Sequence, residues 1–187
     1  SQLDIGDASL VFGRIDQFGE DDTNESFYIG RIAVWDEKQD PITVDWRAPI
    51  SEPFYRATGR EAMGLTRRRH FASRGKKLLG IEDEFFGEDI IDDSDAPYFK
   101  GRMTPLPTME QARTGRLGDI IATIQGEQDE IIRAPLAGPL VVQGGPGTGK
   151  TVVALHRAAY LLYTHRFPLE GQGVLVVGPN RVFLTYI

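Results

Sequence analysis

The sequence has no cysteine, few histidines and no long apolar run. Without cysteine there is no disulfide and no thiolate ligand for a metal, and three isolated histidines argue against a transition-metal site. A membrane-spanning helix needs about 20 consecutive apolar residues. The first residues also lack the basic-then-apolar order of a secretion signal. We therefore expect a soluble, cytoplasmic protein with no membrane partner.

Positive charge is scarce in the first half of the chain. The net charge is −6 over 187 residues. Residues 1–95 hold 12 Lys and Arg against 21 Asp and Glu, whereas residues 96–187 hold 9 against 6. Because an acidic surface repels phosphate backbones, the N-terminal half is not expected to bind nucleic acid non-specifically.

The most informative stretch that is present is the glycine-rich segment 144–151. It fits the phosphate-binding pattern G-x-x-x-x-G-K-[ST] at every position. Glycines permit positive φ angles and a close approach of the backbone to phosphate, and the N-terminus of a following helix directs N–H groups at the anion. The predicted nucleotide-binding residues of this loop are Gly144, Gly145, Pro146, Gly147, Thr148, Gly149, Lys150 and Thr151.

The flanking sequence also fits a site for a nucleoside triphosphate. The apolar run 140–142 predicts a buried strand that enters the loop, and apolar residues at helical spacing after Thr151 predict a helix that leaves it. Lys150 would reach the β and γ phosphates, and the Thr151 hydroxyl would hold Mg²⁺. Both residues are therefore predicted to be catalytic.

The rest of the chain predicts three regions. Residues 27–35 and 41–47 predict a hairpin, and 67–71 and 76–79 two further short strands, so residues 1–95 form a small antiparallel β extension. Proline-rich residues 96–116 are a linker or wrapping segment. Residues 117–187, with a second apolar strand at 174–177, begin a RecA-like parallel sheet. The predicted fold class is α/β, an incomplete P-loop NTPase after a β extension.

A P-loop ATPase also needs a carboxylate at the end of another hydrophobic strand to complete the Mg²⁺ site. Glu170 is the only carboxylate after Lys150, and it lies in a predicted loop. Residues 78–84 superficially resemble such a strand, but their glycine and acidic run fit an exposed turn better. The second acidic motif is therefore missing from this chain.

Other clusters have structural interpretations that compete with functional ones. The basic residues between Arg67 and Lys77 could contact phosphates, or could pair with the acidic run 82–95, which we favour. His156 is interpreted as a packed helix residue. The aromatic residues interpreted as core are Trp35, Trp46, Phe54 and Tyr55.

Gln128, 22 residues before Lys150, narrows the class of P-loop protein. With the series 124–128, the Gly-Thr-Gly-Lys-Thr loop and residues 155–161, the chain resembles the start of superfamily 1 helicases of the UvrD/Rep type. The resemblance implies that Gln128 reads the adenine of ATP, and an amide can both accept from and donate to that base. Val152 stands where UvrD relatives carry an arginine that can lie on the adenine face.

The sequence is more similar still to the HelD family, bacterial ATP-driven factors that bind RNA polymerase and release it from nucleic acid. The similar segments are 12–16, 27–31, 44–49, 54–55, the Arg67 cluster, 118–125 and 177–184. The last segment matches a strand-to-helix corner that touches the nucleic-acid backbone in DNA helicases. The resemblance therefore implies nucleic-acid or partner contacts for Pro179, Asn180 and Arg181.

The resemblance implies an ATPase with ATP and Mg²⁺ as cofactors, and with RNA polymerase and DNA or RNA as partners of the full-length protein. Two alternatives stay open: a DNA helicase that unwinds duplex, and a nucleotide-switched adaptor that does not hydrolyse ATP. The family's coiled-coil arm is expected before Ser1, and further motifs after Ile187. We expect this chain to be a monomeric fragment, inactive by itself.

Overall fold

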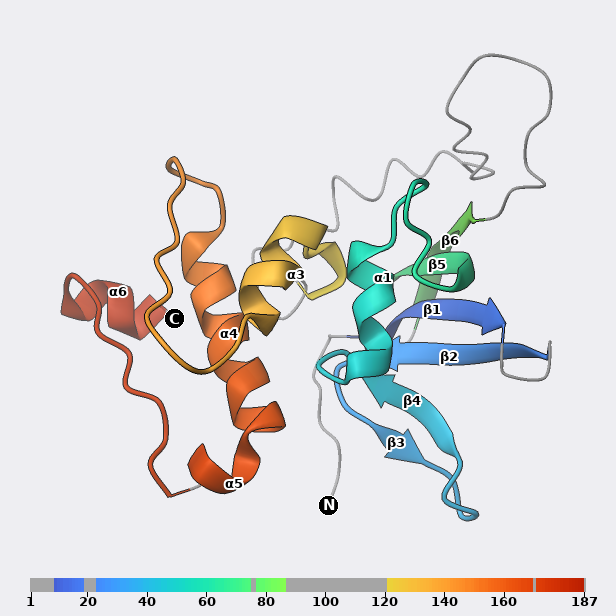
Figure 1. Cartoon of the computed structure of the whole chain (residues 1–187), viewed down its shortest axis with the longest axis horizontal. Coiled ribbons are helices and arrows are strands. Elements are labelled where there is room, and N and C mark those ends of the chain that lie inside the picture. The colour runs from blue at the N-terminus through green and yellow to red at the C-terminus, as the bar shows by residue number, and fades with distance from the viewer. Residues whose placement is uncertain (1–8, 19–22, 75–76, 87–120, 170, 187) are drawn as a thin grey trace. The chain divides into compact units, whose positions relative to one another are not determined.

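A computed structural model describes residues 9–18, 23–74, 77–86, 121–169 and 171–186 (Figure 1). The chain divides into two compact units, Ser1–Ile131 and Ile132–Ile187. The division falls within helix α3 (Gly126–Arg133). The predicted linker 96–116 lies outside the described residues.

The first unit contains a six-stranded sheet with the strand order β3-β4-β2-β1-β5-β6. Neighbouring strands are antiparallel except β2 and β4, which pair in parallel through Ile29 and Val44. The predicted antiparallel sheet is thus confirmed apart from this one pair. The strands are β1 (Val11–Phe18), β2 (Asn24–Gly30), β3 (Val34–Trp35), β4 (Pro41–Asp45), β5 (Leu65–Arg74) and β6 (Lys77–Phe85).

The predicted hairpin around residues 36–40 is confirmed, but its first strand is two strands. β3 pairs with β4, and the Asp36 carboxylate caps the turn by accepting from the backbone N–H groups of Lys38 and Asp40 at 2.8 and 2.9 Å. β2 ends earlier, at Gly30, where a Cβ would lie 2.8 Å from the Leu10 carbonyl oxygen. The close approach requires glycine there.

The core of the first unit lies between the sheet and α1 (Glu52–Arg56), which follows the short helix η1 (Pro49–Ser51) (Figure 1). Phe54 is 1% exposed and contacts Phe12 edge to face, with ring centroids 5.7 Å apart. A Cβ on Gly13 would lie 2.2 Å from the Phe54 ring, so glycine at this position lets α1 approach β1. Ile15 and Ile29 complete the fully buried centre.

Two details of the predicted core are corrected. Trp46, Phe54 and Tyr55 are buried as predicted, but Trp35 is 59% exposed because it lies on a two-residue edge strand. In β4 the polar face is the buried one: Thr43 is 2% exposed, whereas Ile42 is 53% exposed. Burial of Thr43 is tolerated because its hydroxyl donates to the Ile32 carbonyl at 2.9 Å.

The second unit is helical where it is regular. α4 (Lys150–Thr164) confirms the helix predicted after the glycine loop, and α5 (Arg166–Leu169) follows it. α6 (Arg181–Tyr186) begins after Asn180, whose side-chain oxygen accepts from the Phe183 N–H at 2.9 Å and so caps the helix. No helix in the described part of the chain has the length and apolar character of a membrane span.

The parallel sheet predicted for this region is not formed among the described residues. Segments 140–142 and 174–177 belong to no strand, and Val141, Leu175 and Val177 are more than 80% exposed. Exposure alternates along the second segment: 44, 88, 43 and 84% from Val174 to Val177, as in an extended chain covered on one side. A strand is defined by a hydrogen-bonded neighbour, and apolar content alone does not supply one.

Candidate nucleotide-binding site

The glycine loop joins an extended segment to the N-terminus of α4. Gly147 and Gly149 have φ angles of 78° and 83°, in the left-handed region that other residues rarely adopt. Gly149 is the N-cap of α4, and its carbonyl accepts the first helical hydrogen bond from Val153 N–H at 2.9 Å. The two glycines therefore set the turn from which the helix starts.

The Lys150 side chain folds back over this loop. Its ammonium donates to the carbonyl oxygens of Gly144 and Gly145 at 2.8 and 2.6 Å and lies 3.4 Å from the Thr148 hydroxyl. The Thr148 hydroxyl in turn donates to the Gly145 carbonyl at 2.9 Å. The loop thus holds a cation at its centre through its own backbone oxygens.

The field at the start of α4 favours an anion. The first N–H groups of a helix have no intrahelical acceptor, and the helix dipole adds partial positive charge at this end. The first turn contains no acidic residue, and Lys150 and Thr151 are its first two residues. Backbone N–H groups, an ammonium and a hydroxyl therefore gather at one helix end. The N–H groups and the ammonium suit a phosphate, and the hydroxyl oxygen suits its magnesium ion.

Two side chains of α4 anchor the helix. His156 is 8% exposed, and its Nδ1 lies 2.8 Å from the Val152 carbonyl oxygen, which confirms its interpretation as a packed residue. The guanidinium of Arg157 donates to the carbonyl oxygens of Ile132, Ala134 and Pro135 at 3.1, 2.6 and 2.8 Å, a role that the sequence did not predict. The sequence does set Arg157 apart, because it is the only Lys or Arg between Lys150 and Arg166.

Gln128 belongs to the first unit and has a role in its own helix. Its side-chain oxygen accepts from the Gln125 N–H at 3.1 Å, the reciprocal half of a capping box at the start of α3. Its neighbour Asp129 is fully buried, which the sequence analysis did not anticipate. The amide of Gln128 therefore serves as a helix cap in this structure.

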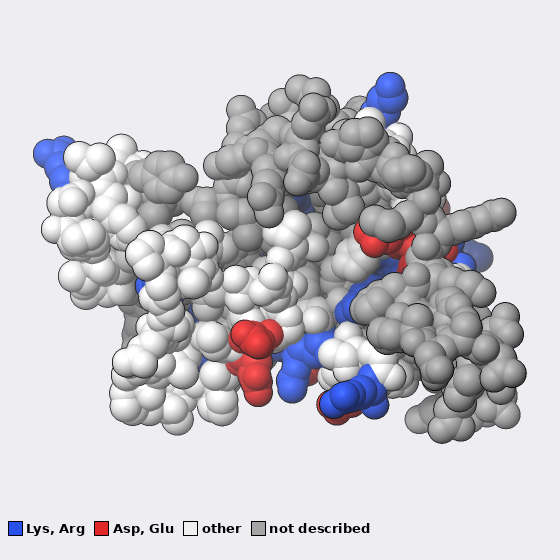
Figure 2. Space-filling model, turned by 90° about the horizontal axis from the view of Figure 1, so that it is seen from above, with Lys and Arg blue, Asp and Glu red and all other residues white. Residues whose placement is uncertain are grey.

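The corner before α6 is a close-packed turn. A Cβ on Gly178 would lie 2.5 Å from the Phe183 ring, so this position requires glycine. Pro179, Asn180 and Arg181 are all exposed. In the view of Figure 2 most of the described surface is uncharged, some acidic and basic atoms lie next to one another, and other basic atoms stand apart.

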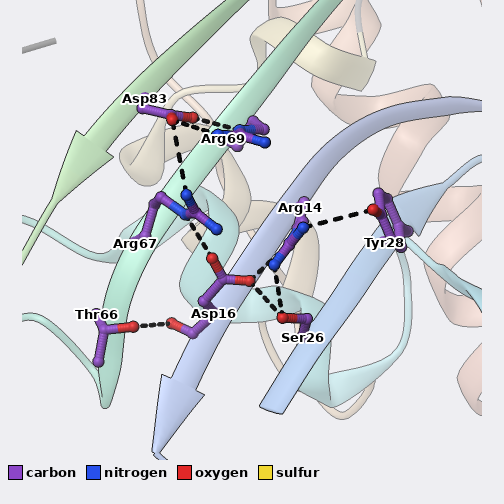
Figure 3. A network of polar contacts seen from close by, with 8 residues as sticks. All are labelled: Arg14, Asp16, Ser26, Tyr28, Thr66, Arg67, Arg69 and Asp83. Atoms are coloured by element: carbon purple, nitrogen blue, oxygen red, sulfur yellow. Dashed lines mark hydrogen bonds and ion pairs between the residues drawn. The ribbon is translucent and has the colours of Figure 1, made fainter. Parts of the chain in front are cut away.

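The arginines of β5 are held by carboxylates of neighbouring strands. Arg67 donates to Asp16 at 2.5 Å, and Arg69 binds both oxygens of Asp83 at 2.5 Å (Figure 3). On the other face of β5, Arg68 binds Glu84. The favoured interpretation, pairing of the basic cluster with the acidic run, is thus confirmed for Arg68 and Arg69, whereas Arg67 binds Asp16 of β1 and lies 3.9 Å from Asp83. These ion pairs neutralise charge that a phosphate-backbone contact would need.

These pairs also correct the interpretation of residues 78–84 as a turn. The segment lies within β6, because β5 and β6 pair along their lengths and Asp83 and Glu84 each face an arginine across the ladder. Asp83 and Glu84 are therefore structural partners of arginines in the first unit, which gives no support to a catalytic role for either.

Three side chains of the first unit have pKa values below their usual values. Burial alone would raise the pKa of Asp16, but hydrogen bonds from Ser26, Arg14 and Arg67 outweigh it, and the pKa lies below its usual value. The pKa of Asp83 is lowered mainly by its hydrogen bonds from Arg69. Burial, with a smaller contribution from the charge of Arg68, lowers the pKa of His70 to about 4.

Comparisons with known proteins first indicate the class of protein. Residues 124–178, which span α3, the glycine loop and α4, match the UvrD/Rep helicase N-terminal domain. The second unit thus has the sequence of a P-loop, superfamily 1 helicase-like domain.

Residues 1–98, more than half of the chain, match the N-terminal domain of DNA helicase IV, HelD. The chain belongs to the HelD family. A comparison with curated proteins finds no match. Both family matches are to helicases, so the chain is helicase-like.

Proposed function

We propose that this chain is the nucleotide-binding front part of an ATP-hydrolysing motor that binds RNA polymerase and releases it from nucleic acid. Membership of the HelD family supports the class. The observation that carries the proposal is the loop at the start of α4, where left-handed glycines, the helix N-terminus and the Lys150 ammonium gather around one point.

In this proposal each loop residue has one task. The backbone of residues 144–149 cradles the triphosphate, Lys150 transfers its hydrogen bonds from the loop carbonyls to the β and γ phosphates, and the Thr151 hydroxyl binds Mg²⁺. ATP bound with Mg²⁺ supplies the phosphoryl-transfer chemistry. Segments 140–142 and 174–177 become strands of a RecA-like parallel sheet once they are paired.

The test is Lys150→Ala in the full-length protein, with Lys38→Ala as the matched control because Lys38 lies on an exposed turn of the first unit. We expect Lys150→Ala to abolish ATP turnover and ATP-dependent release of RNA polymerase from nucleic acid, because its ammonium is the mobile cation of the loop. Unchanged ATPase activity in that variant would refute the proposed function.

A second candidate is a DNA helicase that unwinds duplex, which the matched family descriptions favour. A strand-displacement assay beside the polymerase-release assay separates the two, because a remodelling factor releases polymerase without displacing a strand. If the Lys150→Ala variant binds no nucleotide yet still releases polymerase, then neither the ATP-driven release motor nor the DNA helicase describes this protein. A wild type that binds ATP and releases polymerase without turnover is the third candidate, a nucleotide-switched adaptor.

Gln128 carries the proposed choice of base. Gln128→Ala should lower the preference for ATP over GTP and leave phosphate affinity unchanged, because it removes a base contact and not the cradle. Glu127→Ala, on the same turn of α3, is the control. Unaltered discrimination in Gln128→Ala would assign Gln128 to helix capping alone.

The 187-residue chain by itself should not hydrolyse ATP, because Glu170 is the only carboxylate that follows Lys150. A phosphate-release assay on the chain and on its Lys150→Ala variant measures this. Turnover that depends on Lys150 would reveal an upstream catalytic carboxylate. Pro179, Asn180 and Arg181 are proposed to contact nucleic acid or the polymerase.

A further inference from the structure

Arg157 makes the densest set of side-chain to backbone contacts in the second unit's described residues. One guanidinium nitrogen lies 3.1 Å from the Ile132 carbonyl oxygen and 2.6 Å from that of Ala134, and a second lies 2.8 Å from that of Pro135. All three acceptors lie at the C-terminal end of α3 or just beyond it. The side chain therefore ties this end to α4.

The chemistry of these contacts suits an arginine. The last carbonyls of a helix have no intrahelical donors and carry the negative end of the dipole, so a cation there satisfies both needs. The rigid fork of a guanidinium presents several donors at fixed angles, which lets it hold three oxygens at once. A lysine ammonium also has three N–H donors, but all three are on one nitrogen atom.

The position of this contact relates it to the glycine loop. The segment that enters the loop starts after Pro135, and the helix that leaves it starts at Lys150. Arg157 lies seven residues, or two turns, after Lys150 and on the same face of α4, at about 10 Å along the axis. Arg157 thus fixes the beginning of the loop segment onto the helix that follows the loop.

We propose that Arg157 is a positioning residue for the nucleotide site. It holds the last turn of α3 and the start of the loop segment on α4, so that the loop keeps its position on this helix when it binds phosphate. The inference rests on the proposed function, because it assigns a device for the ATP site. It adds a residue that touches neither base nor phosphate.

The test compares Arg157→Ala and Arg157→Lys with the wild type in the full-length protein. We expect Arg157→Ala to raise KM for Mg-ATP about tenfold and to change kcat less than about threefold, because the reacting phosphate keeps its own contacts. Arg157→Lys should recover part of this loss through its remaining donors.

Arg133→Ala is the matched control. The Arg133 guanidinium also joins the end of α3 to α4, because it lies 5.4 Å from the centre of the Tyr160 ring. Its loss should lower thermal stability slightly and leave KM for Mg-ATP within about twofold of the wild type. Thermal unfolding of every variant shows whether a change in KM follows stability or positioning.

If Arg157→Ala fails to fold, Arg157→Lys decides. An unchanged KM with a lowered Tm would leave Arg157 a packing residue and overturn the proposal.

The two hypotheses fail in different ways. Lys150→Ala with wild-type turnover refutes the ATPase, whatever Arg157 does. Loss of turnover in Lys150→Ala, together with wild-type KM in a folded Arg157→Ala protein, refutes only the positioning role.

Discussion

The two units of this chain differ in where their stabilising contacts come from. In the first unit, strands far apart in sequence pair side by side, and the buried Asp16 carboxylate receives hydrogen bonds from Arg14, Ser26 and Arg67. In the second unit, the described contacts are mainly within helices or between close segments, and Leu175 stays 88% exposed. The glycine loop 144–151 nevertheless has a defined backbone turn, set by Gly147 and Gly149.

The difference teaches that the site and the sheet around it have separate physical requirements. The loop is specified by glycines in the left-handed region and by the start of α4, both local in the chain. The predicted parallel sheet needs neighbouring strands, which are non-local. A mutation should therefore affect global stability in the first unit and nucleotide binding in the second.

The largest effect is expected in the polar network of the first unit. Asp16→Ala leaves Arg14 and Arg67 without the carboxylate that both contact, and removal of one partner from a buried ion pair typically destabilises by about 3–5 kcal/mol. Denaturant unfolding of the chain, followed by the fluorescence of the buried Trp46, measures this. Glu37→Ala, on the exposed turn, should change nothing measurable. A loss below about 1 kcal/mol for Asp16→Ala would show that the network contributes little.

A smaller effect is expected from acid. The folded-state pKa of His70 is about 4, below the unfolded value near 6.5, so the unfolded state takes up the proton first as the pH falls. The stability that depends on neutral His70 is complete above about pH 6.5 and is lost progressively down to about pH 4, with an upper limit on the order of 3 kcal/mol.

His70→Gln should flatten this part of the pH-stability curve in equilibrium unfolding. Asp16 and Asp83 have lowered pKa values, so their contribution is present above about pH 4 and is lost only below it. The His70→Gln variant should therefore keep the loss below pH 4. An unchanged slope between pH 6.5 and 4 would assign that slope to other groups.

The smallest effect on stability is expected in the second unit. Gly149→Ala places a side chain at φ 83°, which costs about 1–2 kcal/mol locally. Because the strain falls on the N-cap of α4, Mg-ATP affinity should decrease more than thermal stability. Gly171→Ala is the control, since a Cβ there meets nothing within 4 Å. Equal losses of stability and affinity in Gly149→Ala would remove the proposed separation between site and scaffold.

The sequence predicted those parts of the fold that depend on local signals. The start of α4 after the glycine loop and the 36–40 turn are each encoded by a few adjacent residues, and both are confirmed. The pairing of Arg68 and Arg69 with β6 followed from opposite charge on neighbouring runs. The nucleotide site itself stays a prediction.

The remaining features depend on contacts that a single sequence does not display. Trp35 is exposed because its strand is an edge, and edge position is a property of the whole sheet. The burial of Thr43 depends on a carbonyl supplied from another segment, Ile32. Arg157 could be noticed as a lone cation in α4, but its three acceptors are 22 to 25 residues away.

Lys150 makes any binding of phosphate an exchange. Its ammonium already holds the carbonyl oxygens of Gly144 and Gly145, so an incoming anion must compete with two internal acceptors for the same protons. The measured affinity then reports the difference between the two sets of partners and not the strength of either. The lysine thus acts as an internal competitor for any anion at this loop, because its ammonium already holds two carbonyl oxygens of the loop.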